Sequence, residues 1–162
     1  MAAQRRQKGG YFAAEDGAPA PLAVSVQRRI HFSDVDPMGV LWHGRYTYLF
    51  EEGNEALGRL CELTYADFFR ERVRAPIVQL HVDYFAPVML AEVVTIRAQM
   101  PWTEGARINI EYEIRRQDGT LAATGYSVQM FIDEAGVPLV ASPSVLEACR
   151  GRWRQGLLGG AT

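Results

Sequence analysis

Four consecutive segments in the second half of the chain alternate apolar and polar residues, and this pattern limits the fold more than any other feature. The segments are 77–85, 92–100, 107–116 and 121–132. In the third segment, Ile108, Ile110 and Tyr112 fall on one face, and Asp118-Gly119 is a favoured hairpin turn before the fourth. A period of two is typical of half-buried strands. The sequence therefore predicts four antiparallel strands whose apolar faces need a covering layer.

A long segment with helical periodicity precedes these strands. It begins between His43 and Tyr46 and runs to about Leu63, with apolar residues at spacings of three and four. The apolar positions are Tyr46, Leu49, Phe50, Ala56, Leu57, Leu60 and Cys61. An interior glycine costs about 1 kcal/mol relative to alanine, so we expect Gly53 to pack closely against another backbone. Residues 22–32 predict one more strand, on which Arg28 is a misfit among apolar neighbours.

Two shorter helices complete the expected elements. Thr64 and Asp67 have the spacing of a capping box for a helix over about residues 64–71. A C-terminal helix over 143–153 would have Ser142 as its N-cap and Pro143 at its first position. The predicted fold class is α+β, an antiparallel sheet of about five strands wrapped around a long central helix. Its uncovered edges and outer face favour dimerisation.

Length and composition describe a single soluble domain. The 162 residues predict one domain over 23–155, with a mobile leader over 1–22 and a flexible tail over 156–162. Tyr11 and Phe12 are the leader residues that could dock on a neighbouring surface. A net charge of −2 gives no reason to expect nucleic acid, and no apolar run is long enough to span a membrane. Cys61 and Cys149 are expected to be packed thiols of a cytoplasmic protein.

The residues that could carry chemistry lie between Phe32 and Glu52. Asp36 stands in a turn just before the expected start of the long helix. A carboxylate can act on water or on a carbonyl carbon, and free N–H groups at a helix start can hold an oxygen that becomes negative. An isolated Asp-Pro step is more often only a turn, so the catalytic interpretation of Asp36 depends on the whole motif. We expect Asp34 to be structural and to cap N–H groups of the turn.

The run from Phe32 to Tyr46 closely resembles the signature of the 4-hydroxybenzoyl-CoA thioesterase-like proteins, which include the Tol-Pal-associated acyl-CoA thioesterases. Over residues 24–150 the order of elements resembles the hotdog fold, and Asp83 to Pro87 resembles a strand motif common in such proteins. The resemblance implies an acyl-CoA thioesterase that hydrolyses an aliphatic or aromatic acyl thioester to the free acid and coenzyme A. It implies no cofactor and no metal, and a homodimer or homotetramer with its site at the dimer interface.

The resemblance also implies roles for individual residues. By position, Asp36 is the catalytic carboxylate, acting as nucleophile or general base, and the backbone N–H of His43 polarises the thioester carbonyl. The side chain of His43 could help to orient substrate. The implied substrate-binding residues are Gly39, Val40, Trp42, Gly44, Tyr46 and Arg107.

Three alternatives stay open. In the 4-hydroxybenzoyl-CoA thioesterase a basic cluster contacts coenzyme A phosphates, whereas the matching run after Trp102 keeps only Arg107 and contains Glu104. The chain could therefore be an acyl-carrier-protein thioesterase, or a non-catalytic acyl-thioester-binding protein. Glu51 or Glu52 on the long helix could also be the catalytic acid.

Overall fold

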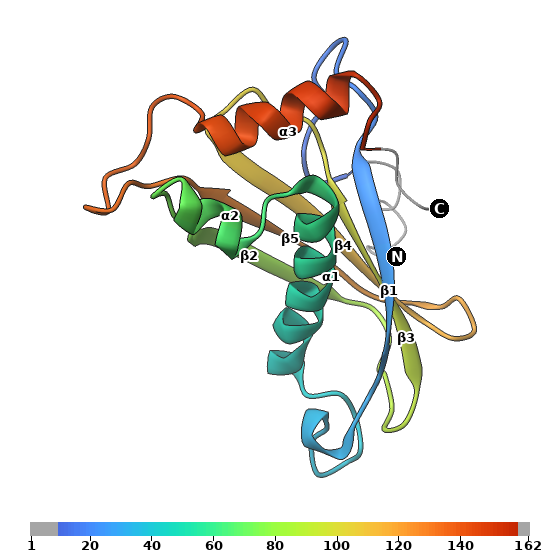
Figure 1. The fold of residues 1–162 in the computed structure, drawn as a ribbon. Helices are drawn as coiled ribbons and strands as arrows, with labels where there is room; N and C mark the ends of the chain where they lie inside the picture. The colour runs from blue at the N-terminus through green and yellow to red at the C-terminus, as the bar shows by residue number, and fades with distance from the viewer. Residues whose placement is uncertain (1–9, 159–162) are drawn as a thin grey trace.

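A computed structural model describes residues 10–158 and shows one helix lying across one antiparallel sheet (Figure 1). The strands are β1 (Leu22–Arg29), β2 (Ile77–Tyr84), β3 (Val93–Met100), β4 (Arg107–Arg116) and β5 (Leu121–Met130). Their order across the sheet is β1-β3-β4-β5-β2, and every neighbouring pair is antiparallel. The predicted α+β class and the four later strands are confirmed.

The first strand is shorter than the sequence predicted. β1 ends at Arg29, and Phe32 begins a 3-10 turn with its side chain 82% exposed, so its place on the apolar face was predicted wrongly. Arg28 does face the helix side of the sheet. Its Nε donates to Glu52 Oε1 on α1 (Tyr46–Cys61) at 2.8 Å. This ion pair is the reason that a cation is tolerated among apolar residues.

The helix α1 packs against β1 and β3 on the inner face of the sheet. A 3-10 turn, His43–Arg45, precedes it, and Glu62 ends it in the left-handed region with φ 55°. The buried positions of α1 are Tyr46, Leu49, Phe50, Gly53, Leu57 and Cys61. A Cβ atom on Gly53 would lie 3.1 Å from side-chain atoms of both Ala98 and Ile96, which confirms the predicted close approach to the sheet.

A second close approach joins α1 to the centre of the sheet. The Phe50 ring stacks on the Tyr112 ring of β4, with centroids 4.4 Å apart and an interplanar angle of 8°. Gly125 of β5 lies opposite Tyr112 in the sheet. A Cβ atom on Gly125 would lie 2.5 Å from Phe50 Cε2 and would also overlap the His81 carbonyl oxygen. Only glycine leaves room for the stacked pair.

Both shorter helices are present, one with a corrected start. In α2 (Tyr65–Arg70), Thr64 Oγ1 accepts from the Asp67 N–H and the Asp67 carboxylate accepts from the Thr64 N–H, which confirms the capping box. In α3 (Ser144–Arg154) the N-cap is Pro143 and not Ser142. The Ser142 hydroxyl accepts instead from the guanidinium of Arg150, at 2.7 Å.

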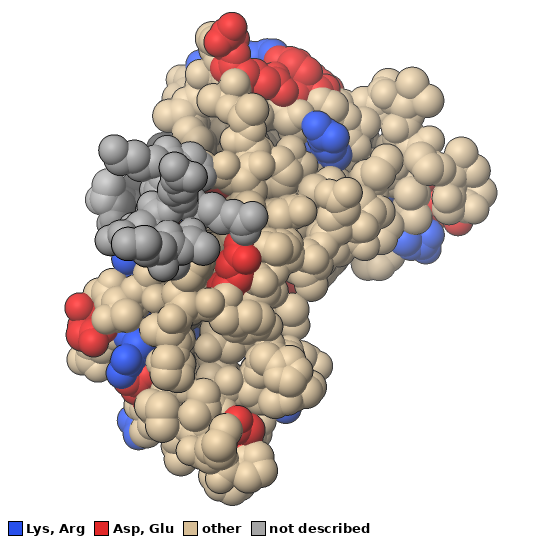
Figure 2. All heavy atoms as spheres, turned by 180° about the vertical axis from the view of Figure 1, so that it is seen from behind, with Lys and Arg blue, Asp and Glu red and all other residues tan. Residues whose placement is uncertain are grey.

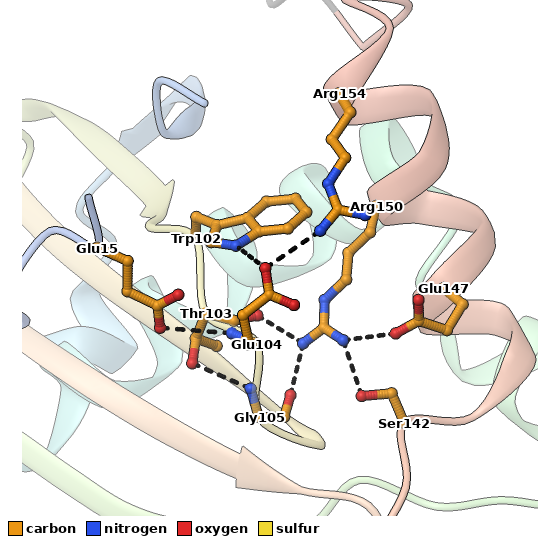
Figure 3. Close-up of polar contacts among 9 residues, drawn as sticks. All are labelled: Glu15, Trp102, Thr103, Glu104, Gly105, Ser142, Glu147, Arg150 and Arg154. Carbon is orange, nitrogen blue, oxygen red and sulfur yellow. Dashed lines mark hydrogen bonds and ion pairs between the residues drawn. The ribbon is translucent and has the colours of Figure 1, made fainter. Parts of the chain in front are cut away.

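Arg150 fastens α3 to the loop between β3 and β4 (Figure 3). It is 3% exposed, and its Nη2 donates to the carbonyl oxygens of Thr103 and Gly105 at 2.6 and 2.5 Å. The carboxylate of Glu104 in the same loop accepts from the Trp102 indole at 2.9 Å and from Arg154 at 3.1 Å. The loop is therefore held by backbone and side-chain contacts together.

Part of the expected leader lies on the outer face of the sheet. The Tyr11 hydroxyl donates to Asp83 Oδ2 at 2.8 Å, and the rings of Tyr11 and Phe12 pack on Tyr126. The expected docking of these two aromatic residues is therefore confirmed. Figure 2 shows the side of the molecule away from α1, where acidic and basic side chains are separated by uncharged surface. Residues 1–9 and 159–162 lie outside the described residues.

The two cysteines meet although they are far apart in the chain. Cys61 ends α1 and Cys149 belongs to α3, and both are buried free thiols. A hydrogen bond between them, together with burial, raises the pKa of Cys61. The predicted packed thiols are confirmed.

The packing at Gly125 gives a stability prediction. We expect Gly125→Ala to lower the free energy of unfolding by about 1–3 kcal/mol, because overpacking displaces core side chains and backbone. Urea unfolding followed by circular dichroism measures the change. Gly151→Ala in α3 is the control, since no atom lies within 4 Å of its added Cβ, and it should be neutral or stabilising by up to about 1 kcal/mol. Equal stability of Gly125→Ala and the wild type would contradict the steric argument.

Candidate active site

The acidic motif folds into a short hairpin in front of α1. The Trp42 N–H donates to the Asp34 carbonyl at 2.9 Å, and the Asp36 N–H donates to the Val40 carbonyl at 2.8 Å. Gly39 makes the turn with φ 76°, in the left-handed region that glycine adopts without strain. The hairpin carries the chain directly into the turn that starts α1.

Asp36 builds this hairpin with one of its two carboxylate oxygens. Oδ1 accepts from the N–H groups of Met38 at 2.8 Å and Val40 at 3.2 Å. Among residues 10–158, Oδ2 has no hydrogen-bond partner, and the side chain is partly exposed. The structure therefore shows the turn role of Asp36 and leaves one oxygen available for chemistry.

A second turn of the same construction occurs near the C-terminus. The Asp133 N–H donates to the Val137 carbonyl at 2.9 Å, Asp133 Oδ1 accepts from the Val137 N–H at 2.8 Å, and Gly136 has φ 82°. Turn chemistry alone therefore accounts for an aspartate at both places. The two turns differ in the segment that each one enters, because the turn at Asp133 leads into an exposed loop where Val140 is fully exposed.

Free backbone amides come after the turn at Asp36. The Arg45 N–H donates to the Trp42 carbonyl at 2.8 Å, so the first two N–H groups of the 3-10 turn are those of His43 and Gly44. Neither has an acceptor within residues 10–158. Unpaired N–H groups at a helix start carry the positive end of the helix dipole and bind anions. The structure thus places His43 where a negative oxygen would be stabilised.

Aromatic side chains surround these amides. The Trp42 ring lies against the Cα of Gly44, where any side chain would overlap it. Tyr46 is buried, and its ring meets the Tyr84 ring edge-on with centroids 4.9 Å apart. Burial, with a smaller contribution from Tyr84, raises the pKa of Tyr46 to about 12. Tyr46 is therefore a neutral core residue, whereas Trp42 and Tyr84 are half-exposed.

Asp34 and Glu52 have structural partners. Asp34 is 7% exposed, and its Oδ2 accepts from the His31 N–H at 2.8 Å, which confirms the predicted capping role. Glu52 is the ion-pair partner of Arg28. Of the two glutamates on α1, this leaves Glu51 as the one without an arginine partner within the described part of the chain.

Glu51 borders a pocket between α1, α2 and the sheet, with about 490 Å³ of empty space. Its carboxylate accepts from the Tyr65 hydroxyl at 3.0 Å, and the buried Gln129 donates to Asn54 at 3.4 Å. The apolar side chains of the wall are Leu57, Leu63, Phe68, Met100, Ile108 and Ile110. Sequence reasoning missed this pocket, because its walls come from distant segments.

Arg107 lies at the other end of the sheet from Asp36. In the β1–β3 pair, Arg29 faces Val93 near the acidic hairpin, whereas Leu22 faces Met100 at the far end. Arg107 starts β4 after the loop that leaves Met100, and strand β3 spans roughly 26 Å between the two ends. Within one subunit the structure therefore does not bring Arg107 to Asp36.

Basic residues that sequence reasoning missed lie near this far loop. Arg150 and Arg154 of α3 are within 5.8 and 4.6 Å of the Trp102 ring centroid. Their spacing of four residues puts them on one helix face, which was the available signal. Both are engaged by protein groups, Arg150 by backbone carbonyls and Arg154 by Glu104.

Comparison with known proteins identifies the family. A model of the thioesterase-like superfamily matches residues 30–148. The chain belongs to the thioesterase-like superfamily. This confirms the resemblance indicated by the acidic motif, and with it the prediction of a thioester hydrolase. The match begins after the docked leader and includes Asp36, His43, Gly44 and Tyr84.

Individual relatives agree with this membership. The acyl-CoA thioesterase YbgC of Haemophilus influenzae is 26% identical over 121 residues, which cover 74% of this chain and 88% of that protein. The DHNA-CoA thioesterase of Staphylococcus aureus has a TM-score of 0.69 at 23% identity, covering 83% of this chain and 88% of the other. SAV2348 of Staphylococcus aureus, solved in complex with CoA, has a TM-score of 0.73 at 15% identity, covering 91% and 98%. These structural likenesses show the hotdog fold.

Neither a metal cluster nor a membrane span is found in the described part of the chain. Between residues 10 and 158, no three side chains of the metal-binding types His, Cys, Asp and Glu are grouped to hold an ion. In the same range, no helix has the length and apolar character to cross a bilayer.

An ion pair supports the loop on which the acidic hairpin rests. The Leu90 N–H donates to the Gly39 carbonyl at 2.9 Å, and in the same loop the Met89 N–H donates to Glu92 Oε2 at 2.9 Å. The Arg116 guanidinium also donates to both Glu92 oxygens. Hydrogen bonds from Arg116 lower the pKa of the Glu92 carboxyl below its ordinary value.

This pair predicts a pH-dependent contribution to stability. Since the pKa of Glu92 is lowered in the folded state, its stabilisation is complete above the unfolded pKa of about 4.3 and is lost as pH falls through the folded value. We expect Glu92→Gln to lower the free energy of unfolding by about 1–3 kcal/mol at pH 7, with the difference shrinking towards pH 3. Urea unfolding at both pH values measures it.

Glu55→Gln is the control for this prediction. Glu55 pairs with Arg59 at the surface, where both side chains are more than half exposed, so its loss should cost no more than about 0.5 kcal/mol. A Glu92→Gln effect that stays constant from pH 7 to pH 3 would contradict the ionic origin of the stabilisation.

Proposed function

We propose that this chain hydrolyses acyl-CoA thioesters to the free acid and coenzyme A, with Asp36 as the reacting carboxylate. The observation that carries the proposal is the free Oδ2 of Asp36 in a hairpin that leads directly to the unpaired N–H of His43. Thioester cleavage needs a nucleophile or base at the carbonyl carbon and donors for the oxygen that becomes negative. Family membership supports the same reaction.

Two routes use the same groups. In the first, Asp36 Oδ2 attacks the carbonyl carbon, coenzyme A leaves as its thiolate, and water hydrolyses the resulting mixed anhydride. In the second, Asp36 takes a proton from water while the water oxygen attacks the carbonyl carbon. In both routes the His43 N–H holds the oxyanion of the tetrahedral intermediate. The second Asp36 oxygen stays bound to the turn and keeps the carboxylate in place.

The pocket beside Glu51 is proposed to take the acyl group. It begins about 7.5 Å along the α1 axis from Tyr46, given a rise of about 1.5 Å per residue. Its wall is mostly apolar, which suits an aliphatic or an aromatic group.

The site is proposed to be completed by a second copy of the chain. β2 is an edge strand, and it presents Ile77, Val78 and Leu80 each about half exposed. An exposed apolar edge strand is a template for pairing with another strand. Phe32 and Met38, beside the acidic hairpin, are also more than three-quarters exposed. A dimer through β2 would cover the edge and adjoin the Tyr84 end of the strand.

A carrier-protein thioester is the second candidate substrate. Glu104 is held in place by Trp102 and Arg154, so the loop presents a carboxylate where the resemblance expects phosphate contacts. A carrier protein presents the same phosphopantetheine thioester without the adenosine phosphates. Comparing acyl-CoA and acyl-carrier-protein substrates decides between the two thiols.

The principal test is Asp36→Asn. Asparagine keeps the oxygen that accepts from Met38 and Val40 but removes the nucleophile or base, so kcat should fall by at least about 100-fold with an unchanged melting temperature. Thiol release from short, medium, long and aromatic acyl-CoAs measures it. Asp133→Asn is the matched control, because that residue builds the same turn away from α1, and it should keep wild-type activity.

Two outcomes would contradict the assignment of Asp36. Wild-type rates in Asp36→Asn would leave the residue with its turn role alone. Loss of activity in Glu51→Gln with activity kept in Asp36→Asn would move the reacting acid to the helix. Saturable binding without thiol release by the wild type would show a binding protein instead of an enzyme.

The edge strand gives a prediction about assembly. Val78→Lys puts like charges opposite each other in a symmetric β2 pair, so this variant should run at the monomer mass of 18.1 kDa and lose activity. Size-exclusion chromatography with light scattering measures the mass. Val140→Lys is the control, because Val140 is fully exposed on a loop. A Val78→Lys chain with the wild-type mass would contradict assembly through β2.

A further inference from the structure

A hydroxyl group of β2 reaches the turn that starts α1. Tyr84, the last residue of β2, donates from its hydroxyl to the His43 carbonyl oxygen at 2.8 Å. Its ring is held edge-on against Tyr46, with an interplanar angle of 88°. The bond therefore connects the edge strand of the sheet with the amides beside Asp36.

The carbonyl that Tyr84 binds belongs to the same peptide unit as the Gly44 N–H. A trans peptide unit is planar, and its C=O and N–H groups point in opposite directions. The described residues contain no cis peptide, so a donor that fixes the His43 oxygen also fixes the direction of the Gly44 N–H. A hydrogen bond to the carbonyl polarises the unit and strengthens its N–H as a donor.

The bond is not needed to form the turn itself. The turn already has its own bond from the Arg45 N–H to the Trp42 carbonyl, and the hairpin before it is closed by backbone bonds. The Gly44 N–H has no acceptor among the described residues. Tyr84 thus acts on a peptide whose donor is unused in the folded chain.

We propose that Tyr84 is a positioning residue for the thioester hydrolysis. Its hydroxyl orients and polarises the His43–Gly44 peptide, so that the Gly44 N–H joins the His43 N–H in holding the thioester oxygen. Tyr84 acts through this peptide and does not touch the reacting atoms. The inference rests on the proposed function and adds a second oxyanion donor together with the residue that aims it.

The protonation of Tyr84 fits this role. Desolvation raises the pKa of Tyr84 above its ordinary value, so the hydroxyl stays protonated and donating at neutral pH. Its contribution should therefore not titrate between pH 6 and 9.

Tyr84→Phe tests the inference, because it keeps the ring against Tyr46 and removes only the hydroxyl. We expect kcat to fall by about tenfold, since a mis-aimed oxyanion donor weakens transition-state binding, with KM and melting temperature unchanged. Tyr48→Phe is the matched control. Tyr48 is 62% exposed on α1, and its hydroxyl has no hydrogen bond within residues 10–158, so kcat should stay at the wild-type value.

A spectroscopic measurement separates positioning from general stability. In the Asp36→Asn background, infrared difference spectra of a bound acyl-CoA with a ¹³C-labelled carbonyl report how strongly the protein polarises that carbonyl. We expect the stretch to lie at lower frequency in Asp36→Asn than in Asp36→Asn/Tyr84→Phe. Unchanged kcat in Tyr84→Phe, or an equal stretch in both backgrounds, overturns the role of Tyr84 and leaves the proposed function standing. A wild type that releases no thiol overturns both.

Discussion

The position of α1 on the sheet is the constraint on which the rest of the structure depends. Two glycines make it possible, since Gly53 lets the helix approach β3 and Gly125 leaves room for the Phe50–Tyr112 stack. Because the helix is fixed along its buried face, the place of its first turn is fixed as well. The free amides of His43 and Gly44 can therefore face a substrate without help from flexible segments.

The acidic hairpin shows how a common turn acquires a special place. Asp36 and Asp133 make the same hydrogen bonds, with glycines of similar φ. The difference between them is tertiary: the first turn is tied to the loop before β3 and leads into α1, whereas the second ends in an exposed loop. The proposed chemistry of Asp36 is therefore a property of its surroundings, because the local conformation is shared by a residue with no such surroundings.

Much of the fold could be predicted because its signals are local. Alternation located the strands, three-and-four spacing located α1, and Thr64 with Asp67 located the start of α2. The errors arose where local rules compete with tertiary contacts. Phe32 continued the alternation of β1 but left the sheet when Asp34 capped the chain at His31. Ser142 had the chemistry of an N-cap but accepts from Arg150 instead.

The candidate site divides in the same way. The sequence by itself determined the acid, the turn and the helix start, because these are contiguous and their hydrogen bonds join near neighbours in the chain. Only the tertiary structure decided that Tyr84 reaches the His43 carbonyl, that Glu51 borders a pocket, and that Arg107 lies at the far end of the sheet. These are contacts between segments distant in sequence. Their geometry depends on strand order and helix placement, which no local pattern specifies.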